Sequence, residues 1–219
     1  MTSGHQNYFE KADEFDEEYF KSLEKIIRKK RFNEEMDLIY ELMPPVPGDK
    51  ILDVGCGTGR LGLFLLNREK NIEVTFSDVS FQSAKYLLGQ KFVVCPSSRM
   101  PFSDKYFDKI YCLHMISHVK KIEESISELY RIIKENGELL IITPNKYYVY
   151  VLRVAAFLKL IPEYDFDKTA KHLFGKNQLR KFLEKFGWQV KKADYFGSFA
   201  SKYLNFDFLR WHILLIAKK

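Results

Sequence analysis

The sequence predicts an α/β fold in which a mostly parallel sheet carries helices on both faces. Residues 50–62, KILDVGCGTGRLG, pass from an apolar run through three glycines into a helical pattern. A strand, a glycine turn and a helix in this order begin a Rossmann-like βαβ unit, because glycine allows a tight turn and the close approach of a ligand. Further short apolar runs alternate with helical patterns as far as residue 145, which is typical of a parallel sheet.

The composition indicates one folded domain. The chain has 219 residues, of which 46% are hydrophobic and 16% aromatic, enough for a substantial core. Residues 1–6 are polar and lack the apolar core of a signal peptide, so we expect a cytoplasmic location. No run of about 20 apolar residues is present, so no transmembrane segment is expected. Cys56, Cys95 and Cys112 lack metal-ligand spacing, and no metal is expected.

Charge is distributed unevenly along the chain. Residues 1–145 contain 20 Lys and Arg against 23 Asp and Glu, a net charge of −3, whereas residues 146–219 contain 15 against 6, a net charge of +9. The basic C-terminal third is either an ordinary solvated surface or a region that attracts an anionic substrate, a membrane surface or RNA.

Prolines, glycines and changes of hydrophobic period mark where one predicted element ends and the next begins. Residues 1–47 predict an N-terminal helical cap, with two helices and a break near Phe32 and Asn33, ended by prolines at 44, 45 and 47. After the first strand, helical patterns are expected up to residue 68, at 80–90 and at 122–134, where residues 136–137 would cap the helix. Strands are expected at 72–77, 92–95, 107–114 and 138–143.

Two acidic residues at strand ends suggest the kind of ligand. Asp53 stands two residues before the first glycine, where it would repel a pyrophosphate but would suit a ligand that carries positive charge. Asp78 ends the second strand, 25 residues after Asp53, where a carboxylate can accept both hydroxyls of a ribose. The alternative for Asp78 is the N-cap of the following helix.

These residues carry a resemblance to a known family. Residues 53–59, DVGCGTG, resemble motif I of the class I S-adenosylmethionine-dependent methyltransferases, and the resemblance is to the small-molecule branch. It continues at residues 77–80, 100–102, 107–108 and 137–139 and covers roughly residues 50–145. It implies a seven-stranded, mostly parallel sheet that is completed by a C-terminal antiparallel hairpin at 188–196 and 208–217, after a helix at 175–186. The implied cofactor is S-adenosyl-L-methionine, and the product is S-adenosyl-L-homocysteine.

The resemblance also implies a set of cofactor-binding residues. These are Asp53, Gly55, Cys56, Gly57, Gly59, Asp78, Val79, Ser97, Ser98, Leu113 and His114, and Tyr8 of the cap is a candidate to cover the bound cofactor or an ordinary packing residue. The family usually places an acid after the third strand to bind adenine, but Pro96 stands there. Ser97 or Ser98 could substitute through a hydroxyl or the backbone.

Methyl transfer from a sulfonium is an in-line displacement that needs alignment and the exclusion of water, but no metal. A base can assist the acceptor, and His114 and His172 are the catalytic candidates. The sequence lacks the Asn-Pro-Pro-Tyr motif that marks amino-group methylation of nucleic-acid bases or glutamine in relatives, and it lacks the Cys pair of pyrimidine C5 methylation. Both absences favour a small, hydrophobic or anionic acceptor. The alternatives are an RNA methyltransferase and a non-catalytic cofactor-binding protein on the same fold.

The chain after the fifth strand has an unusual composition. Residues 147–161 are apolar nearly all round, interrupted by Arg153 and Lys159, yet they are too short to span a membrane. They are expected either to pack within the domain or to cover a hydrophobic substrate, and peripheral membrane contact is compatible with both. The predicted plan is therefore a cofactor-binding core at 48–145, a substrate-side insertion at 146–175, and a last helix and hairpin at 176–219. The acceptor, the atom methylated and the oligomeric state are left open.

Overall fold

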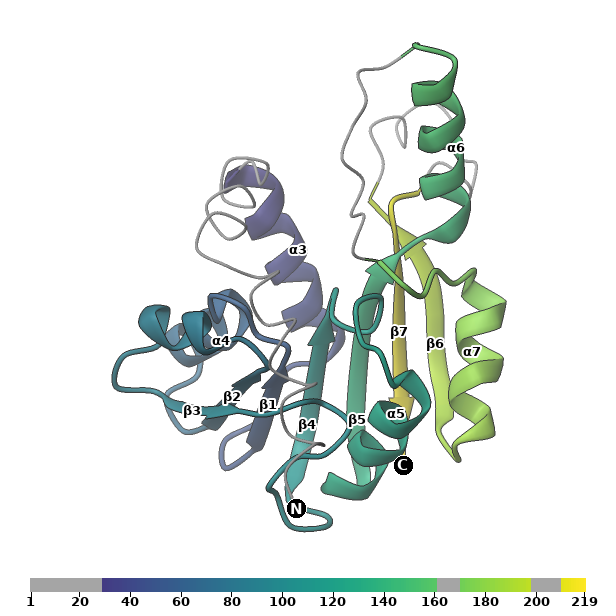
Figure 1. Ribbon diagram of the computed structural model, residues 1–219. Coiled ribbons are helices and arrows are strands. Elements are labelled where there is room, and N and C mark those ends of the chain that lie inside the picture. The colour runs from purple at the N-terminus through teal and green to yellow at the C-terminus, as the bar shows by residue number, and fades with distance from the viewer. Residues whose placement is uncertain (1–28, 161–169, 198–209) are drawn as a thin grey trace, which may run out of the picture.

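The computed structural model describes residues 29–160, 170–197 and 210–219, which contain a seven-stranded sheet with helices on both faces (Figure 1). The strand order is β3-β2-β1-β4-β5-β7-β6. The first five strands in this order are parallel, and β7 lies antiparallel between β5 and β6. The strands are β1 (Lys50–Val54), β2 (Glu73–Asp78), β3 (Lys91–Val94), β4 (Phe107–Leu113), β5 (Ile133–Pro144), β6 (Gln189–Phe196) and β7 (His212–Lys218). The predicted fold, including the C-terminal hairpin, is confirmed.

Two apolar clusters cover the two faces of the sheet. Helices α3 (Lys29–Leu42) and α4 (Arg60–Arg68) pack on one face, and α5 (Ile122–Ile132) and α7 (Lys176–Lys185) pack on the other. Successive strand residues belong to opposite clusters: Ile51 lies in the cluster that contains Met36 and Leu65, whereas Leu52 lies in the cluster that contains Ile126 and Leu179. Because both faces are covered, β1 is apolar on both sides, as in other parallel sheets. Each such buried side chain contributes about 1.5–3 kcal/mol.

The described part of the N-terminal cap, from residue 29 onward, differs from its prediction. Helix α3 runs without interruption through Phe32 and Asn33, so the predicted break there is wrong. The segment contains neither glycine nor proline, and Asn costs a helix only a few tenths of a kcal/mol. Residues 1–28, with Tyr8, lie outside the described residues, and so does most of the loop before β7.

Two other elements differ from the sequence prediction. The helix expected at 80–90 is a short 3-10 helix, η2 (Phe81–Tyr86), because Leu87 turns inward and is buried beside Gly59. Strand β5 begins at Ile133, five residues before the predicted start. Asn136, expected to cap the preceding helix, lies within this strand with a positive φ of 63°, next to a register shift between β4 and β5.

The strand order reverses between β1 and β4, and ligands of parallel α/β sheets bind in the crevice beyond the carboxyl ends at such a point. The residues that follow β1, β2 and β4 therefore meet at one edge. Helix α6 (Lys146–Phe157) rises from the same edge, directly after β5 (Figure 1). None of the described helices is long and apolar enough to cross a bilayer.

Candidate active site

The glycine turn after β1 is held against the end of β2. The N–H groups of Gly55 and Cys56 both donate to the carbonyl of Ser77, at 2.8 and 3.1 Å. Gly55 has a φ of 65°, and a Cβ atom there would lie 2.3 Å from Cγ of Met115. Gly57 follows with a φ of 52°. Only glycine adopts this backbone without strain, so these predicted residues form a rigid, closely packed turn.

The carboxylate of Asp78 ties this turn to the end of β2. Its Oδ2 accepts from the N–H of Gly57 at 2.9 Å, and its Oδ1 accepts from the N–H of Ser80 at 2.8 Å. Ser80, not Asp78, is the N-cap of η2, because its side chain accepts from Gln82. Burial raises the pKa of Asp78, and the backbone bonds oppose the rise. A carboxylate can accept about four hydrogen bonds, so Asp78 retains acceptor capacity for a ribose.

Asp53 lies beneath the glycine turn. Its side chain is almost fully buried, and its Oδ2 accepts from the N–H of Gly62 in α4 at 3.0 Å. Burial raises the pKa of Asp53 to about 7; the hydrogen bond from Gly62 opposes this rise, and the charge of Asp78 adds to it. A cation that binds nearby would favour the ionised form, which keeps the predicted affinity for a positively charged ligand consistent with the geometry.

Replacing Asp53 with asparagine is expected to remove a pH dependence from the free energy of unfolding. The folded protein holds the proton up to pH about 7 and the unfolded chain releases it near 3.8, so wild-type stability falls as the pH rises between these values and then levels off. Three pKa units correspond to about 4 kcal/mol. The amide still accepts from Gly62 but never ionises. Urea unfolding from pH 4 to 8 measures the difference, and equal pH profiles for the two proteins would contradict it.

The turn after β3 contains the serines that were expected near the adenine. The Oγ of Ser97 lies 2.9 Å from the Oγ of Ser125 on α5. Because the hydroxyl of Ser125 donates to the carbonyl of Lys121, Ser97 is the donor to Ser125 and keeps its own lone pairs as acceptors. Ser98 in the same turn and Val79 beyond β2 are both half-buried. A contact from Ser97 to an adenine amine stays a prediction.

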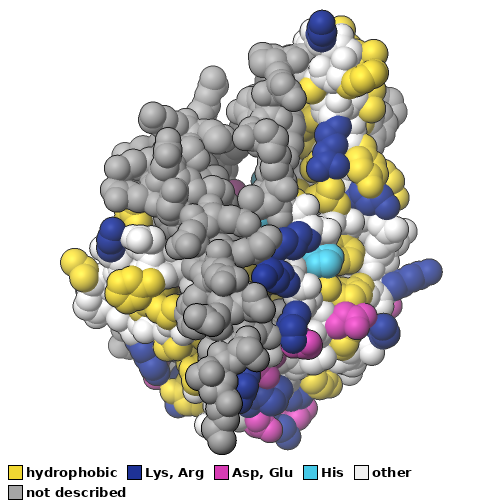
Figure 2. Space-filling view, viewed as in Figure 1, with side chains coloured by type: hydrophobic (Ala, Val, Ile, Leu, Met, Phe, Trp, Pro, Cys, Tyr) yellow, Lys and Arg dark blue, Asp and Glu magenta, His cyan; other side chains and the backbone are white. Residues whose placement is uncertain are grey.

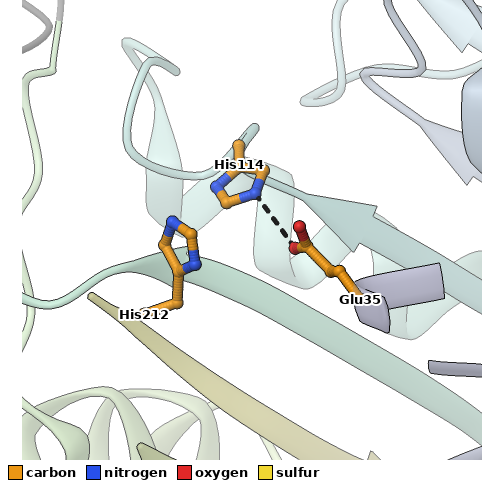
Figure 3. Close-up of side chains that lie close together, drawn as sticks. All are labelled: Glu35, His114 and His212. Atoms are coloured by element: carbon orange, nitrogen blue, oxygen red, sulfur yellow. Dashed lines mark ion pairs between the residues drawn. The ribbon is translucent and has the colours of Figure 1, made fainter. Parts of the chain in front are cut away.

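Three titratable side chains from different elements meet beyond the end of β4 (Figure 3). His114 follows Leu113, the last residue of β4, and has a φ of 57°. Its Nε2 lies 3.5 Å from Oε1 of Glu35 on α3. Its ring centroid lies 4.6 Å from that of His212 at the start of β7. Sequence reasoning identified His114 but missed Glu35 and His212.

The electrostatics of this cluster favour an ionised carboxylate. Burial alone would raise the pKa of Glu35, but the facing imidazole of His114, with His212 and Arg60, outweighs burial and lowers it. Its Oε1 is buried and makes no hydrogen bond within the described part of the chain. An anion beside an imidazole stabilises the imidazolium that forms on proton uptake. The ligand atoms of Glu35, His114 and His212 lie within 4.8 Å of one another, so these residues could also hold a metal ion.

The second predicted base, His172, is held elsewhere. Its Nε2 lies 3.0 Å from the carbonyl of Val119, and its backbone N–H donates to the carbonyl of Ser117. A carbonyl can only accept, so Nε2 carries the hydrogen and only Nδ1 could take up a proton. These contacts fix His172 to the turn after β4, and its role as a base stays a prediction.

Comparisons with known proteins show what the chain is similar to. A family model described as a methyltransferase domain matches residues 27–193. A 24-methylenesterol C-methyltransferase 2 from Arabidopsis thaliana is 34% identical over 48% of this chain and 31% of its own length. A ubiquinone/menaquinone biosynthesis C-methyltransferase from Cereibacter sphaeroides is 27% identical over 48% of this chain and 46% of its own length. The chain thus spans about half the length, or less, of these curated relatives. A crystal structure of a SAM-dependent methyltransferase from Archaeoglobus fulgidus covers 92% of this chain and 99% of its own, with a TM-score of 0.72 and 22% identity.

Proposed function

Because the chain belongs to the methyltransferase domain family, we propose that it transfers a methyl group from S-adenosyl-L-methionine to a small, hydrophobic acceptor and releases S-adenosyl-L-homocysteine. The observation that carries the proposal is the glycine turn braced by Asp78 above the buried Asp53, at the point where the strand order reverses. In this site Asp78 would hold the ribose, Ser97 or Ser98 would hold the adenine, and the turn from Gly55 would hold the methionine part.

The residues after β4 would take part in the reaction itself. When bound, S-adenosyl-L-methionine would supply its methyl group to a lone pair or π-bond of the acceptor, and the electrons of the broken carbon–sulfur bond would remain on sulfur. Where the acceptor also loses a proton, His114 takes it, and the ionised Glu35 stabilises the resulting imidazolium. The two side chains come from different elements but face each other across 3.5 Å, so the base is oriented before the acceptor binds.

The names of the relatives support a hydrophobic acceptor. They refer to sterol carbon methylation, to ubiquinone and menaquinone biosynthesis, and to squalene methylation in Botryococcus braunii. The exposed apolar helix α6 at the same edge as the site fits an acceptor of this class. A proton acceptor such as His114 also suits carbon methylation, which ends with loss of a proton.

Isothermal calorimetry tests the cofactor. We expect S-adenosylmethionine and S-adenosylhomocysteine to bind and NAD not to bind, because the ionised form of Asp53 would repel a pyrophosphate. Tight NAD binding with no response to the two sulfur nucleotides would overturn the proposal. Filter binding with RNA over a salt series tests the main alternative: specific binding with a steep salt dependence would favour an RNA acceptor.

A further inference from the structure

Helix α6 exposes an apolar face. Tyr147, Tyr150, Val151, Val154 and Leu158 recur at intervals of three and four residues, which places them on one side of a helix. Their exposed fractions are 46, 46, 36, 57 and 57%. A surface helix of a globular protein ordinarily turns its polar face outward. In α6 apolar side chains are exposed instead, so the described part of the domain leaves this side of the helix uncovered.

The far end of the helix continues this surface. Phe157 is 84% exposed and Leu160 is 73% exposed, and these are among the most exposed large apolar side chains in the described residues. Side chains of this size at such exposure are expected to be covered by another molecule, because contiguous apolar patches are rare on soluble proteins. We call the surface formed by Tyr147, Tyr150, Val151, Val154, Phe157, Leu158 and Leu160 the α6 face.

The charged side chains of residues 146–160, which include α6, are all basic. Arg153 and Lys159 are exposed, and the ammonium of Lys146 lies 5.9 Å from the ring centroids of both Tyr147 and Tyr150. Residues 146–160 contain no Asp or Glu. On the visible side of α6 in Figure 2, apolar side chains therefore alternate with basic ones and no acidic side chain interrupts them.

The base of α6 is fixed to the sheet. Asn145 is fully buried and caps the helix: its side chain accepts from the N–H of Tyr147 and donates to the carbonyl of Arg210, and its backbone N–H donates to Trp211. Val149 is the buried residue of the helix. The rest of α6 projects beyond the carboxyl edge of the sheet (Figure 1), so it presents the α6 face in a defined direction.

We propose that the α6 face is a membrane-docking surface that inserts into the interfacial region of an anionic lipid bilayer. Helices that lie in this region combine an apolar face with Lys and Arg and carry few acids. Tyrosine is enriched where hydrocarbon meets water, and each cation near an anionic surface strengthens the attachment. A second copy of this chain fits the α6 face less well than a bilayer does. Two α6 helices would bring identical cations together with no acidic residue of either helix to pair with them, so they would repel each other.

Docking through α6 also explains its place in the fold. The helix leaves the sheet at the carboxyl end of β5, the edge that carries the glycine turn and His114. A docked protein would therefore present this edge to the lipid, and a hydrophobic acceptor could reach the site without crossing water. This last step rests on the proposed function, whereas attachment to lipid does not.

Co-sedimentation of the full chain with vesicles tests docking. One set of vesicles contains phosphatidylcholine alone, and the other contains phosphatidylcholine with phosphatidylglycerol. We expect binding to the anionic vesicles that weakens as salt is added. The double variant Val154→Asp/Phe157→Asp should lose more than about tenfold in vesicle affinity. Leu88→Asp is the matched control, because Leu88 is 85% exposed on a different part of the surface and should bind like the wild type.

A charge-reversal variant keeps the test independent of the apolar substitutions. Arg153→Glu/Lys159→Glu should reduce binding to anionic vesicles without loss of fold, which a thermal melt checks. Absence of vesicle binding by the wild type, or equal losses in Leu88→Asp, would overturn the proposal. A dimer in light scattering that dissociates in Val154→Asp/Phe157→Asp, with no vesicle binding, would assign the α6 face to a second copy. Calorimetry with S-adenosylmethionine is read separately, so failure of docking and failure of the proposed function are distinguishable.

Discussion

Replacing Asp78 with alanine is expected to weaken binding of S-adenosylmethionine by about 2–4 kcal/mol, or roughly 30- to 1,000-fold in Kd. The substitution removes the carboxylate that would accept the ribose hydroxyls. It also removes the acceptor for the N–H groups of Gly57 and Ser80, so the glycine turn loses its tie to β2. Calorimetry measures the affinity, and a thermal melt reports how much of the fold is retained.

Two further variants separate these roles of Asp78. Asp78→Asn keeps one acceptor for the turn but loses the charge, so its stability should approach the wild type while its affinity stays reduced. Asp104→Ala is the control for loss of an acid, because Asp104 is exposed and pairs with Arg131 near the amino end of β4, at the opposite edge of the sheet. If a folded Asp78→Ala protein bound S-adenosylmethionine with unchanged affinity, Asp78 would have no role in binding the ribose and would only brace the glycine turn.

Replacing His114 with glutamine should lower turnover by about 10²- to 10⁴-fold, the usual contribution of a general base. Binding of S-adenosylmethionine should change only a few-fold, because the backbone at this position is kept. Radiolabelled methyl transfer to the best acceptor from a panel of quinols and sterols measures turnover. Glu35→Gln should lower turnover by a smaller factor, about tenfold, because it removes the anion that faces the imidazole.

Two controls make the His114 experiment decisive. His118→Gln changes a second imidazole in the turn after β4, where the backbone N–H of His118 donates to the carbonyl of Met115. This variant should leave turnover close to the wild type. A chelator should also leave it unchanged. If a chelator abolished turnover and a divalent ion restored it, then Glu35, His114 and His212 would be a metal centre and the assignment of His114 as a base would fail.

The local sequence determined the frame of the fold. The positive φ values at positions 55 and 57 require glycine. The apolar runs specify strands that are buried on both faces of the sheet. The order of the elements therefore follows from residues close in sequence. The same holds for Asp53 and Asp78, whose places at strand ends are set by the strands themselves. Two local predictions were wrong. The break near Phe32 is absent because helix propagation outweighed a weak local signal, and the helix expected at 80–90 is shorter because Leu87 packs inward.

Only the tertiary structure decided which residues share the site and which face of α6 is covered. Glu35 and His212 are separated from His114 by 79 and 98 residues, and no local pattern marks them; crossing of α3 over the sheet and the antiparallel return of β7 bring them together. The apolar pattern of α6 is compatible with a packed helix as well as an exposed one. Hydropathy measures the free energy that a side chain would gain by leaving water. Whether the side chain is buried depends on the neighbours that the fold places around it.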